Sequence, residues 1–198
     1  MLILASASPR RQELLQQLGW AFRVVKSEAE EVSDPAMEPE RLVLENAGRK
    51  AREVAARIGG QDFVLGADTV VSIQGRIFGK PADAEDAKRM LRRLSGQVHM
   101  VSTGVALAHG GEVWQAAAHT MVAFAELSDA EIARYVATGE PLDKAGAYAI
   151  QGRAAAFVTR IEGSYSNVVG LPLHLLTVLA GKAGMDIYGS DGQGSARG

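Results

Sequence analysis

The sequence predicts a single α/β domain, with a mixed, twisted central β-sheet flanked by helices and two lobes around a cleft. Segments typical of strands alternate with segments typical of helices along most of the chain. Two long strands also follow each other directly, which adds antiparallel pairing to the sheet. The 198 residues are 47% hydrophobic, enough for one sizeable core.

The chain opens with a strand, a tight turn and a helix. Residues 1–5 are apolar and predict a short buried strand. Ser8 is expected at the N-cap of the first helix, and Pro9 suits its first position. Leucines on one face predict that the helix continues through residues 12–18, and Gly19 ends it.

A long helix and a buried strand follow. Residues 40–58 carry apolar side chains at intervals of three, four and seven, the spacing of one helix face. Residues 63–71 are almost wholly apolar and predict a buried strand. Gln74 and Gly75 then mark a turn into a short return strand.

The middle of the chain predicts a capped helix and a long hairpin. Asp83 is expected to cap a third helix that Gly96 closes. Residues 98–108 and 113–125 read as long strands, joined by a hairpin at residues 109–111.

The last third predicts two helices, two strands and a tail. Ser128 and Glu131 form a capping box for a helix that ends near Gly139. Further strands are expected over residues 147–151 and 155–161. A final helix follows residues 171–172 and ends near residue 183. We expect the domain to occupy residues 1–188 and a disordered, polar tail to occupy residues 189–198.

Composition excludes several classes of protein. A formal net charge of −2 does not favour nucleic-acid binding through bulk charge, although a small anion needs only a few local cations. The absence of cysteine excludes disulfides, thiolate metal sites and a cysteine nucleophile. Residues 1–5 are too short for a signal peptide's apolar region, and no apolar run is long enough to span a membrane. We therefore expect a soluble cytoplasmic protein with neither a membrane nor a nucleic acid as partner.

The turn after the first strand is a candidate phosphate site. A helix N-terminus attracts anions, and cations are disfavoured there unless an anion offsets them. Arg10 and Arg11 nevertheless stand in the first turn, beside the hydroxyl groups of Ser6 and Ser8. The alternative is a capped surface helix with two solvated arginines.

Lys50 and Asp68 are charges on apolar elements. Lys50 lies near the centre of the apolar stripe of the second helix, so it either extends to water or points into a cleft to neutralise a ligand. Asp68 interrupts a buried strand and therefore needs a lysine, an arginine or a metal as partner. With Thr69 beside it, Asp68 suits a divalent ion near a phosphate. A buried structural salt bridge is the alternative.

Two further features add charge to the candidate site. Glu28, Glu30 and Glu31 precede the second helix, and one of them could complete a metal site with Asp68. Lys80 lies on a constrained turn and is a second candidate phosphate clamp, or else an ordinary exposed lysine. The four histidines show no metal-ligand spacing, and no Walker loop or dinucleotide fingerprint is present.

An ordered set of short motifs covers nearly the whole chain except the tail. The motifs occupy residues 6–11 (SASPRR), 66–70 (GADTV), 79–81 (GKP), 94–96 (LSG), 103–105 (TGV), 140–146 (EPLDKAG), 149–152 (AIQG) and 163–172 (GSYSNVVGLP). Each motif alone is weak, whereas the set in this order is highly specific and resembles the Maf family.

This resemblance implies a Maf/ITPase-like fold with a nucleotide-binding cleft and a pyrophosphatase that uses a divalent metal cation (Mg²⁺, Mn²⁺ or Co²⁺). By position, Asp68 matches the general base, and Asp68 and Glu31 are the expected metal ligands. The remaining matches are Glu31, Lys50 and Lys80 as charged site residues, Ser6 and Arg11 as the phosphate-side turn, and Arg10, Thr69 and Gln151 as positions for base selection.

The stretch around Gln151 resembles the branch of the family that acts on dTTP and UTP, giving the monophosphate and pyrophosphate, with a link to cell-division arrest. One departure concerns the acidic motif, which is Asp-Glu-Ser in the family and Glu30-Glu31-Val32 here; we favour Glu31 as the metal ligand. The alternatives are a 7-methyl-GTP pyrophosphatase and a non-catalytic septation inhibitor. A nucleoside triphosphate is the expected partner, and a homodimer is left open.

Overall fold

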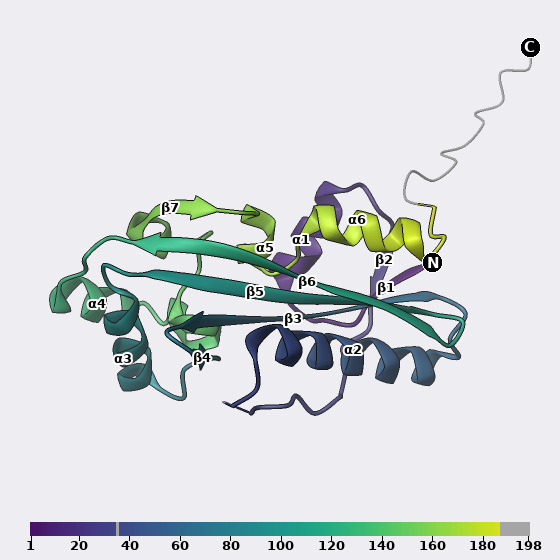
Figure 1. Cartoon of the computed structure of the whole chain (residues 1–198), viewed down its shortest axis with the longest axis horizontal. Helices are drawn as coiled ribbons and strands as arrows, with labels where there is room; N and C mark the ends of the chain where they lie inside the picture. Colours follow the sequence, from purple (N-terminus) through teal and green to yellow (C-terminus); the bar gives the residue numbers. More distant parts are fainter. Residues whose placement is uncertain (35, 187–198) are drawn as a thin grey trace, which may run out of the picture.

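A seven-stranded sheet forms the centre of the fold, and its strand order is β2-β1-β3-β5-β6-β7, with β4 paired to β3 (Figure 1). The computed structural model describes residues 1–34 and 36–186. β1 runs parallel to β2 and β3, and the other pairs are antiparallel, so the predicted mixed sheet is confirmed. The strands are β1 (Leu2–Leu4), β2 (Phe22–Val24), β3 (Phe63–Ile73), β4 (Arg76–Phe78), β5 (Val98–His109), β6 (Glu112–Phe124) and β7 (Val158–Glu162).

Helices flank the sheet. α2 crosses one side, α1 and α6 lie on the other, and α3 and α4 pack together near one end (Figure 1). The helices are α1 (Pro9–Gln17), α2 (Pro39–Ile58), α3 (Ala84–Leu94), α4 (Asp129–Val136), α5 (Tyr165–Val169) and α6 (Leu173–Lys182), and the 3₁₀ helices are η1 (Glu140–Asp143), η2 (Ala145–Ala147) and η3 (Arg153–Phe157). Among the described helices, none has both the length and the apolar character of a membrane span.

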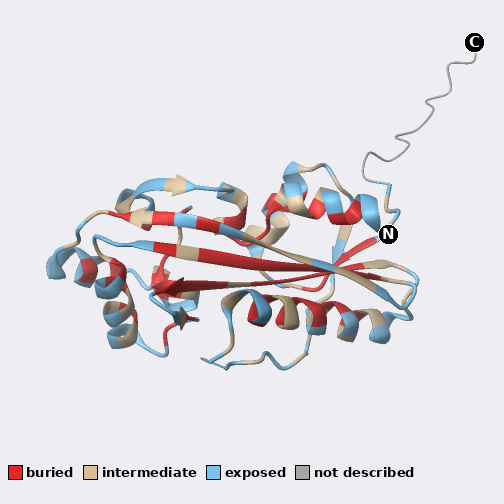
Figure 2. Cartoon of the chain, viewed as in Figure 1, coloured by how far each residue is buried: buried red, intermediate tan, exposed pale blue. Residues whose placement is uncertain are grey.

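The sheet is buried on both faces along its middle, as Figure 2 shows. Successive side chains of a strand point to opposite faces. In β3, Val64 packs with the α2 side, whereas Leu65, Ala67 and Val71 belong to the larger core on the other side. This alternation sends Asp68 and Thr69, which are neighbours in sequence, to opposite faces of the sheet.

Two glycines let α2 lie directly on the backbone of the sheet. A Cβ atom added to Gly66 in β3 would lie 2.2 Å from the carbonyl oxygen of Ala47. One added to Gly104 in β5 would lie 2.4 Å from the carbonyl oxygen of Val43. The absence of side chains at these positions fixes how closely α2 approaches β3.

One edge of β3 is only partly covered. β1 pairs with residues 63–65, and β4 pairs with residues 71–73. Between them, no strand from the described part of the chain pairs with residues 66–70 on this edge. The opening gives side chains from both faces of β3 access to the same space.

Most predicted elements are confirmed, including the long hairpin, the Asp83 cap and the capping box of Ser128 with Glu131. Ser8 occupies the N-cap position of α1, but its side chain makes no capping hydrogen bond. The expected tail at residues 189–198 lies outside the described residues.

The predicted strand at residues 147–151 is wrong. Gly146 and Ala147 have φ angles of 68° and 59°, which turn the backbone through η2 instead of extending it. The strand predicted at residues 155–161 is shorter, because η3 precedes β7. β2 and α5 were not predicted: β2 contains no buried residue, and the five residues of α5 are too few to show a helical period.

Candidate active site

A cavity of about 930 Å³ opens at the uncovered edge of β3. Its walls come from the turn before α1, α2, β3, the turn after β4, the segment around η2 and the loop before α2 that carries Glu28, Glu30 and Glu31, here called the acidic loop. All the site residues expected from the sequence line it: Ser6, Arg10, Arg11, Glu31, Lys50, Asp68, Thr69, Lys80 and Gln151. The fold therefore brings together residues that are far apart in sequence.

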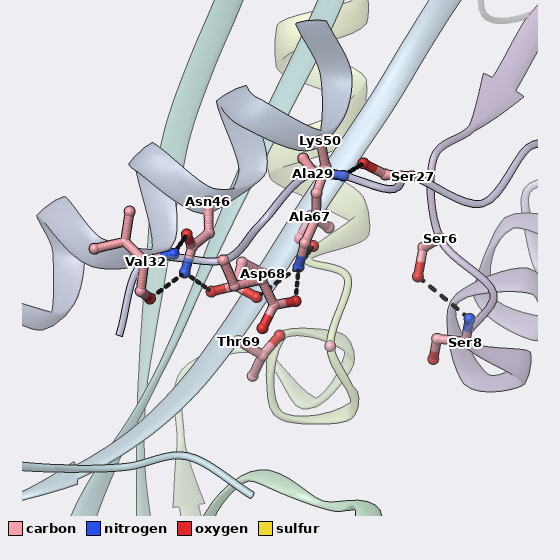
Figure 3. Close-up of polar contacts among 12 residues, drawn as sticks. Ser6, Ser8, Ser27, Ala29, Val32, Asn46, Lys50, Ala67, Asp68 and Thr69 are labelled. Atoms are coloured by element: carbon pink, nitrogen blue, oxygen red, sulfur yellow. Dashed lines mark hydrogen bonds and ion pairs between the residues drawn. The ribbon is translucent and has the colours of Figure 1, made fainter. Parts of the chain in front are cut away.

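Lys50 joins the carboxylates of Asp68 and Glu31 in the cavity wall, and Figure 3 shows Lys50 beside Asp68. Its Nζ atom lies 2.8 Å from Oδ1 of Asp68 and 2.6 Å from Oε1 of Glu31. The side chains of Lys50 and Asp68 are each 12% exposed, so Lys50 points inward and does not extend to water. The ion pair considered as the structural alternative for Asp68 is thus present, and it borders the cavity.

Asn46 is a site residue that the sequence did not reveal. It precedes Lys50 by one helical turn and is buried. Its Nδ2 atom donates to Oδ2 of Asp68 at 3.1 Å and to the carbonyl of Val32 at 3.1 Å, while its Oδ1 accepts from the amide of Val32 at 2.7 Å. Asn46 therefore orients the Asp68 carboxylate and fastens the acidic loop to α2 (Figure 3). The signal available in the sequence was an asparagine next to the apolar stripe of this helix.

Of Glu28, Glu30 and Glu31, only Glu31 lines the cavity. Glu28 instead lies 3.2 Å from the Arg57 guanidinium, and Glu30 is exposed. Burial opposes ionisation of Glu31, but the hydrogen bond and charge of Lys50, aided by Lys80, hold the pKa of Glu31 below its ordinary value. Glu31 is therefore an ionised carboxylate beside Asp68.

Arg11 is a cation whose hydrogen-bond partners are all neutral. Its Nε atom donates to the carbonyl of Gly170 at 2.8 Å, Nη1 to Oγ of Ser6 at 3.3 Å, and Nη2 to Oγ1 of Thr69 at 3.1 Å. Burial lowers the pKa of Arg11, and the charge of Asp68 partly offsets that effect. Within the described residues Arg11 forms no ion pair, so an anion entering the cavity would meet an uncompensated guanidinium.

The turn after β4 and the segment around η2 carry further cations of the cavity lining. The amide of Gly146 donates to the carbonyl of Gly79 at 3.0 Å and ties the turn of Lys80 to the segment around η2. Lys144 on that segment also lines the cavity and pairs with Asp143, a contact not expected from the sequence. Cations from the phosphate-side turn, the turn after β4 and the segment around η2 thus line the same space.

Glu140 anchors the segment that carries Gln151 through hydrogen bonds. Oε1 of Glu140 accepts from the hydroxyl of Tyr135 at 2.9 Å and from the amide of Arg153 at 3.1 Å. The Tyr135 oxygen in turn accepts from the amide of Ala149 at 3.2 Å. Gln151 itself is exposed and borders the cavity, so its amide is available to a ligand.

The carboxylates suit a metal ion that is shared with a ligand. The described residues contain no group of three or more His, Cys, Asp or Glu side chains that could hold a metal by themselves. Asp68 and Glu31 nevertheless converge on one ammonium group, which shows that both reach one cation position. Mg²⁺ is commonly bound by one or two carboxylates together with substrate phosphates. The donor set fits that arrangement.

Comparison with known proteins identifies the relatives of this chain. A dTTP/UTP pyrophosphatase of Symbiobacterium thermophilum is 54% identical over 94% of this chain and 96% of its own length. One of Thermococcus gammatolerans is 53% identical over 89% and 93%. The Ham1 protein of Staphylococcus aureus shares the fold, with a TM-score of 0.53 at 13% identity over 91% of this chain and 98% of that one. The family model described as Maf-like protein matches residues 1–183, and the chain therefore belongs to the Maf-like family.

Proposed function

We propose that this protein hydrolyses dTTP and UTP to the nucleoside monophosphate and pyrophosphate, using a divalent cation such as Mg²⁺, Mn²⁺ or Co²⁺, in the cytoplasm, where nucleoside triphosphates are made and used. The observation that carries the proposal is the cavity where Arg11, Lys50 and Lys80 face Asp68 and Glu31. The choice of bases follows the names of relatives that are 50–54% identical to this chain.

The cations are suited to a polyanionic substrate. Among the described residues, Arg11 has only neutral hydrogen-bond partners. Its charge is therefore available for a phosphate. Lys80 lines the same cavity from the turn after β4, and the two residues would hold the triphosphate together. Binding of this kind positions the α-phosphorus for in-line attack and stabilises the departing pyrophosphate.

Asp68 is the proposed general base. A water oxygen forms the new bond to the α-phosphorus, the bond from that phosphorus to the bridging oxygen breaks, and the water proton passes to the Asp68 carboxylate. Hydrogen bonds from Lys50 and Asn46 fix the orientation of both carboxylate oxygens before the substrate arrives. A divalent cation bound by Asp68, Glu31 and the substrate would supply further charge neutralisation at the phosphates.

Arg10, Thr69 and Gln151 are the proposed base-selecting residues. Uracil and thymine share an edge of two carbonyl acceptors around one N–H donor. Arg10 can only donate, whereas the amide of Gln151 can both donate and accept. Cytosine presents an amino group in place of one acceptor, and a site built on hydrogen bonds rejects such an analogue strongly.

The test is a panel of nucleotides with separate detection of phosphate and pyrophosphate. We expect dTTP and UTP to yield pyrophosphate far faster than CTP or 7-methyl-GTP. Equal cleavage of CTP or 7-methyl-GTP would contradict the base assignment, and release of phosphate alone would contradict the position of attack. If no triphosphate is hydrolysed, the proposed activity is wrong, and the remaining interpretation is a nucleotide-binding protein without catalytic activity.

A further inference from the structure

A line of hydrogen bonds leads from Arg11 into the protein interior. Nη2 of Arg11 lies 3.1 Å from Oγ1 of Thr69, which lies 3.0 Å from Oγ1 of Thr103. Oγ1 of Thr103 lies 3.1 Å from the main-chain carbonyl oxygen of Asn167. Thr69 and Thr103 are directly opposite each other on β3 and β5, and Thr103 and Asn167 are completely buried.

The chemistry of the two ends sets the direction of every bond. A carbonyl oxygen only accepts, so the single hydroxyl proton of Thr103 is used on Asn167. Thr103 must then accept from Thr69, whose own proton is used in that bond. The Thr69 oxygen therefore faces Arg11 as an acceptor, which suits a guanidinium that can only donate.

The far end of this line is held firmly. The side-chain Nδ2 of Asn167 donates to the carbonyl of Val101 at 3.0 Å and to Oγ1 of Thr120 at 2.9 Å. These bonds fasten α5 to β5 and β6, so the Asn167 carbonyl keeps its place beside Thr103. Thr120 also accepts from the amide of Ser164, which precedes α5.

We infer that Thr103 is a positioning residue for anion binding: by fixing the Thr69 hydroxyl as an acceptor, it holds the Arg11 guanidinium ready for a phosphate group. Thr103 itself does not line the cavity and acts through its neighbours. The identity of the anion as a nucleotide phosphate rests on the proposed function. The arrangement of donors and acceptors is independent of which nucleotide is used.

Two substitutions of similar size separate the hydroxyl group from the packing. Thr103→Val keeps the branched shape but removes the acceptor for Thr69, whose proton is then free to turn toward Arg11. Thr103→Ser keeps the hydroxyl group and loses a methyl group. The probe is inorganic pyrophosphate at constant MgCl₂, with its affinity measured by calorimetry. We expect affinity to fall about 10-fold in Thr103→Val and less than about twofold in Thr103→Ser.

A double-mutant cycle with Arg11→Ala tests whether the effect acts through the guanidinium. Arg11→Ala should weaken pyrophosphate binding, and adding Thr103→Val should then weaken it no further. A purely structural role of Thr103 would instead reduce affinity equally in both backgrounds. That result, or equal behaviour of the valine and serine variants, would overturn the inference.

The same cycle distinguishes this inference from the proposed function. If wild-type protein binds pyrophosphate with the expected coupling but cleaves no nucleotide, the positioning role stands and the proposed enzyme activity fails. If wild-type protein binds no pyrophosphate, or Arg11→Ala leaves binding unchanged, the positioning role for phosphate is wrong whatever the nucleotide panel gives.

Discussion

At the scale of single residues, the site is built from charges whose neighbours fix their orientation. Asp68 receives one hydrogen bond on each oxygen, from Lys50 and from Asn46. Both donors come from α2, one turn apart, so the helix presents them together. The carboxylate is thus held in one orientation at the border of the cavity, as a base or metal ligand requires.

Asp68→Asn should keep the fold and lose about 100- to 1000-fold in turnover, because the shape remains while the charge is removed. Steady-state kinetics with UTP and thermal melting measure the two effects separately. Glu30→Gln is the matched control, since Glu30 is exposed and outside the cavity. Turnover within tenfold of wild type would show that Asp68 is neither base nor metal ligand. A large fall in melting temperature would point to a structural salt bridge instead.

The residues recoverable from sequence were those whose type conflicts with their surroundings. Asp68 on an apolar strand and Lys50 on an apolar helix face both signalled a site. Asn46 gave a weaker signal, because an uncharged polar residue on a helix is ordinarily exposed to water and needs no special partner. The link between Thr103 and Asn167 could not be predicted, since it depends on the register of β3 with β5 and on α5, which the sequence did not reveal.

At the scale of elements, the position of α2 depends on backbone contact. Gly66 and Gly104 leave no space between the helix and the two central strands. The hydrophobic period predicted the helix and its buried face correctly, but not its distance from the sheet, because a glycine in a strand has several explanations. That distance determines whether Lys50 reaches Asp68.

Gly66→Ala should displace α2, since the added Cβ atom would lie 2.2 Å from the Ala47 carbonyl oxygen and 2.8 Å from the Ala51 amide nitrogen. We expect a loss of about 1–3 kcal/mol in the free energy of unfolding and a clear fall in turnover as Lys50 shifts. Denaturant unfolding and kinetics are the measurements. Gly181→Ala in α6 is the control, because no atom outside its own stretch of helix lies within 4 Å of the added Cβ. Equal stability of the two variants would contradict the close contact described for α2.

At the scale of the whole molecule, stability should depend on pH through a buried histidine. His99 is 1% exposed, and its Nε2 atom lies 2.8 Å from the hydroxyl of Tyr148. Burial lowers the pKa of His99 from 6.5 to about 4. Between these values the unfolded chain binds a proton that the folded chain does not, so the free energy of unfolding falls as pH decreases from 6.5 to 4.

This shift corresponds to a loss of roughly 3 kcal/mol across that interval, with little change from His99 above pH 6.5. Denaturant unfolding of wild type and His99→Gln at several pH values measures it, because other groups contribute alike to both proteins. The difference in unfolding free energy between the two should change steadily from pH 6.5 to 4. A constant difference would mean that His99 titrates normally in the folded protein.

The uncovered stretch of β3 has a consequence for the solubility of the fold. Ala5 donates to the Leu65 carbonyl on this edge. The main chain of Ala67 and Thr69, two and four residues further along the strand, therefore faces the same way. Peptide groups on a sheet edge that pair with no other strand normally invite another chain to add a strand and begin aggregation. Here β1 and β4 bound the stretch at both ends, and Lys50 extends its ammonium group to within 3.4 Å of the Ala67 carbonyl. The opening is therefore too short and too charged for a neighbouring strand, yet wide enough to leave peptide groups of the sheet facing a small ligand.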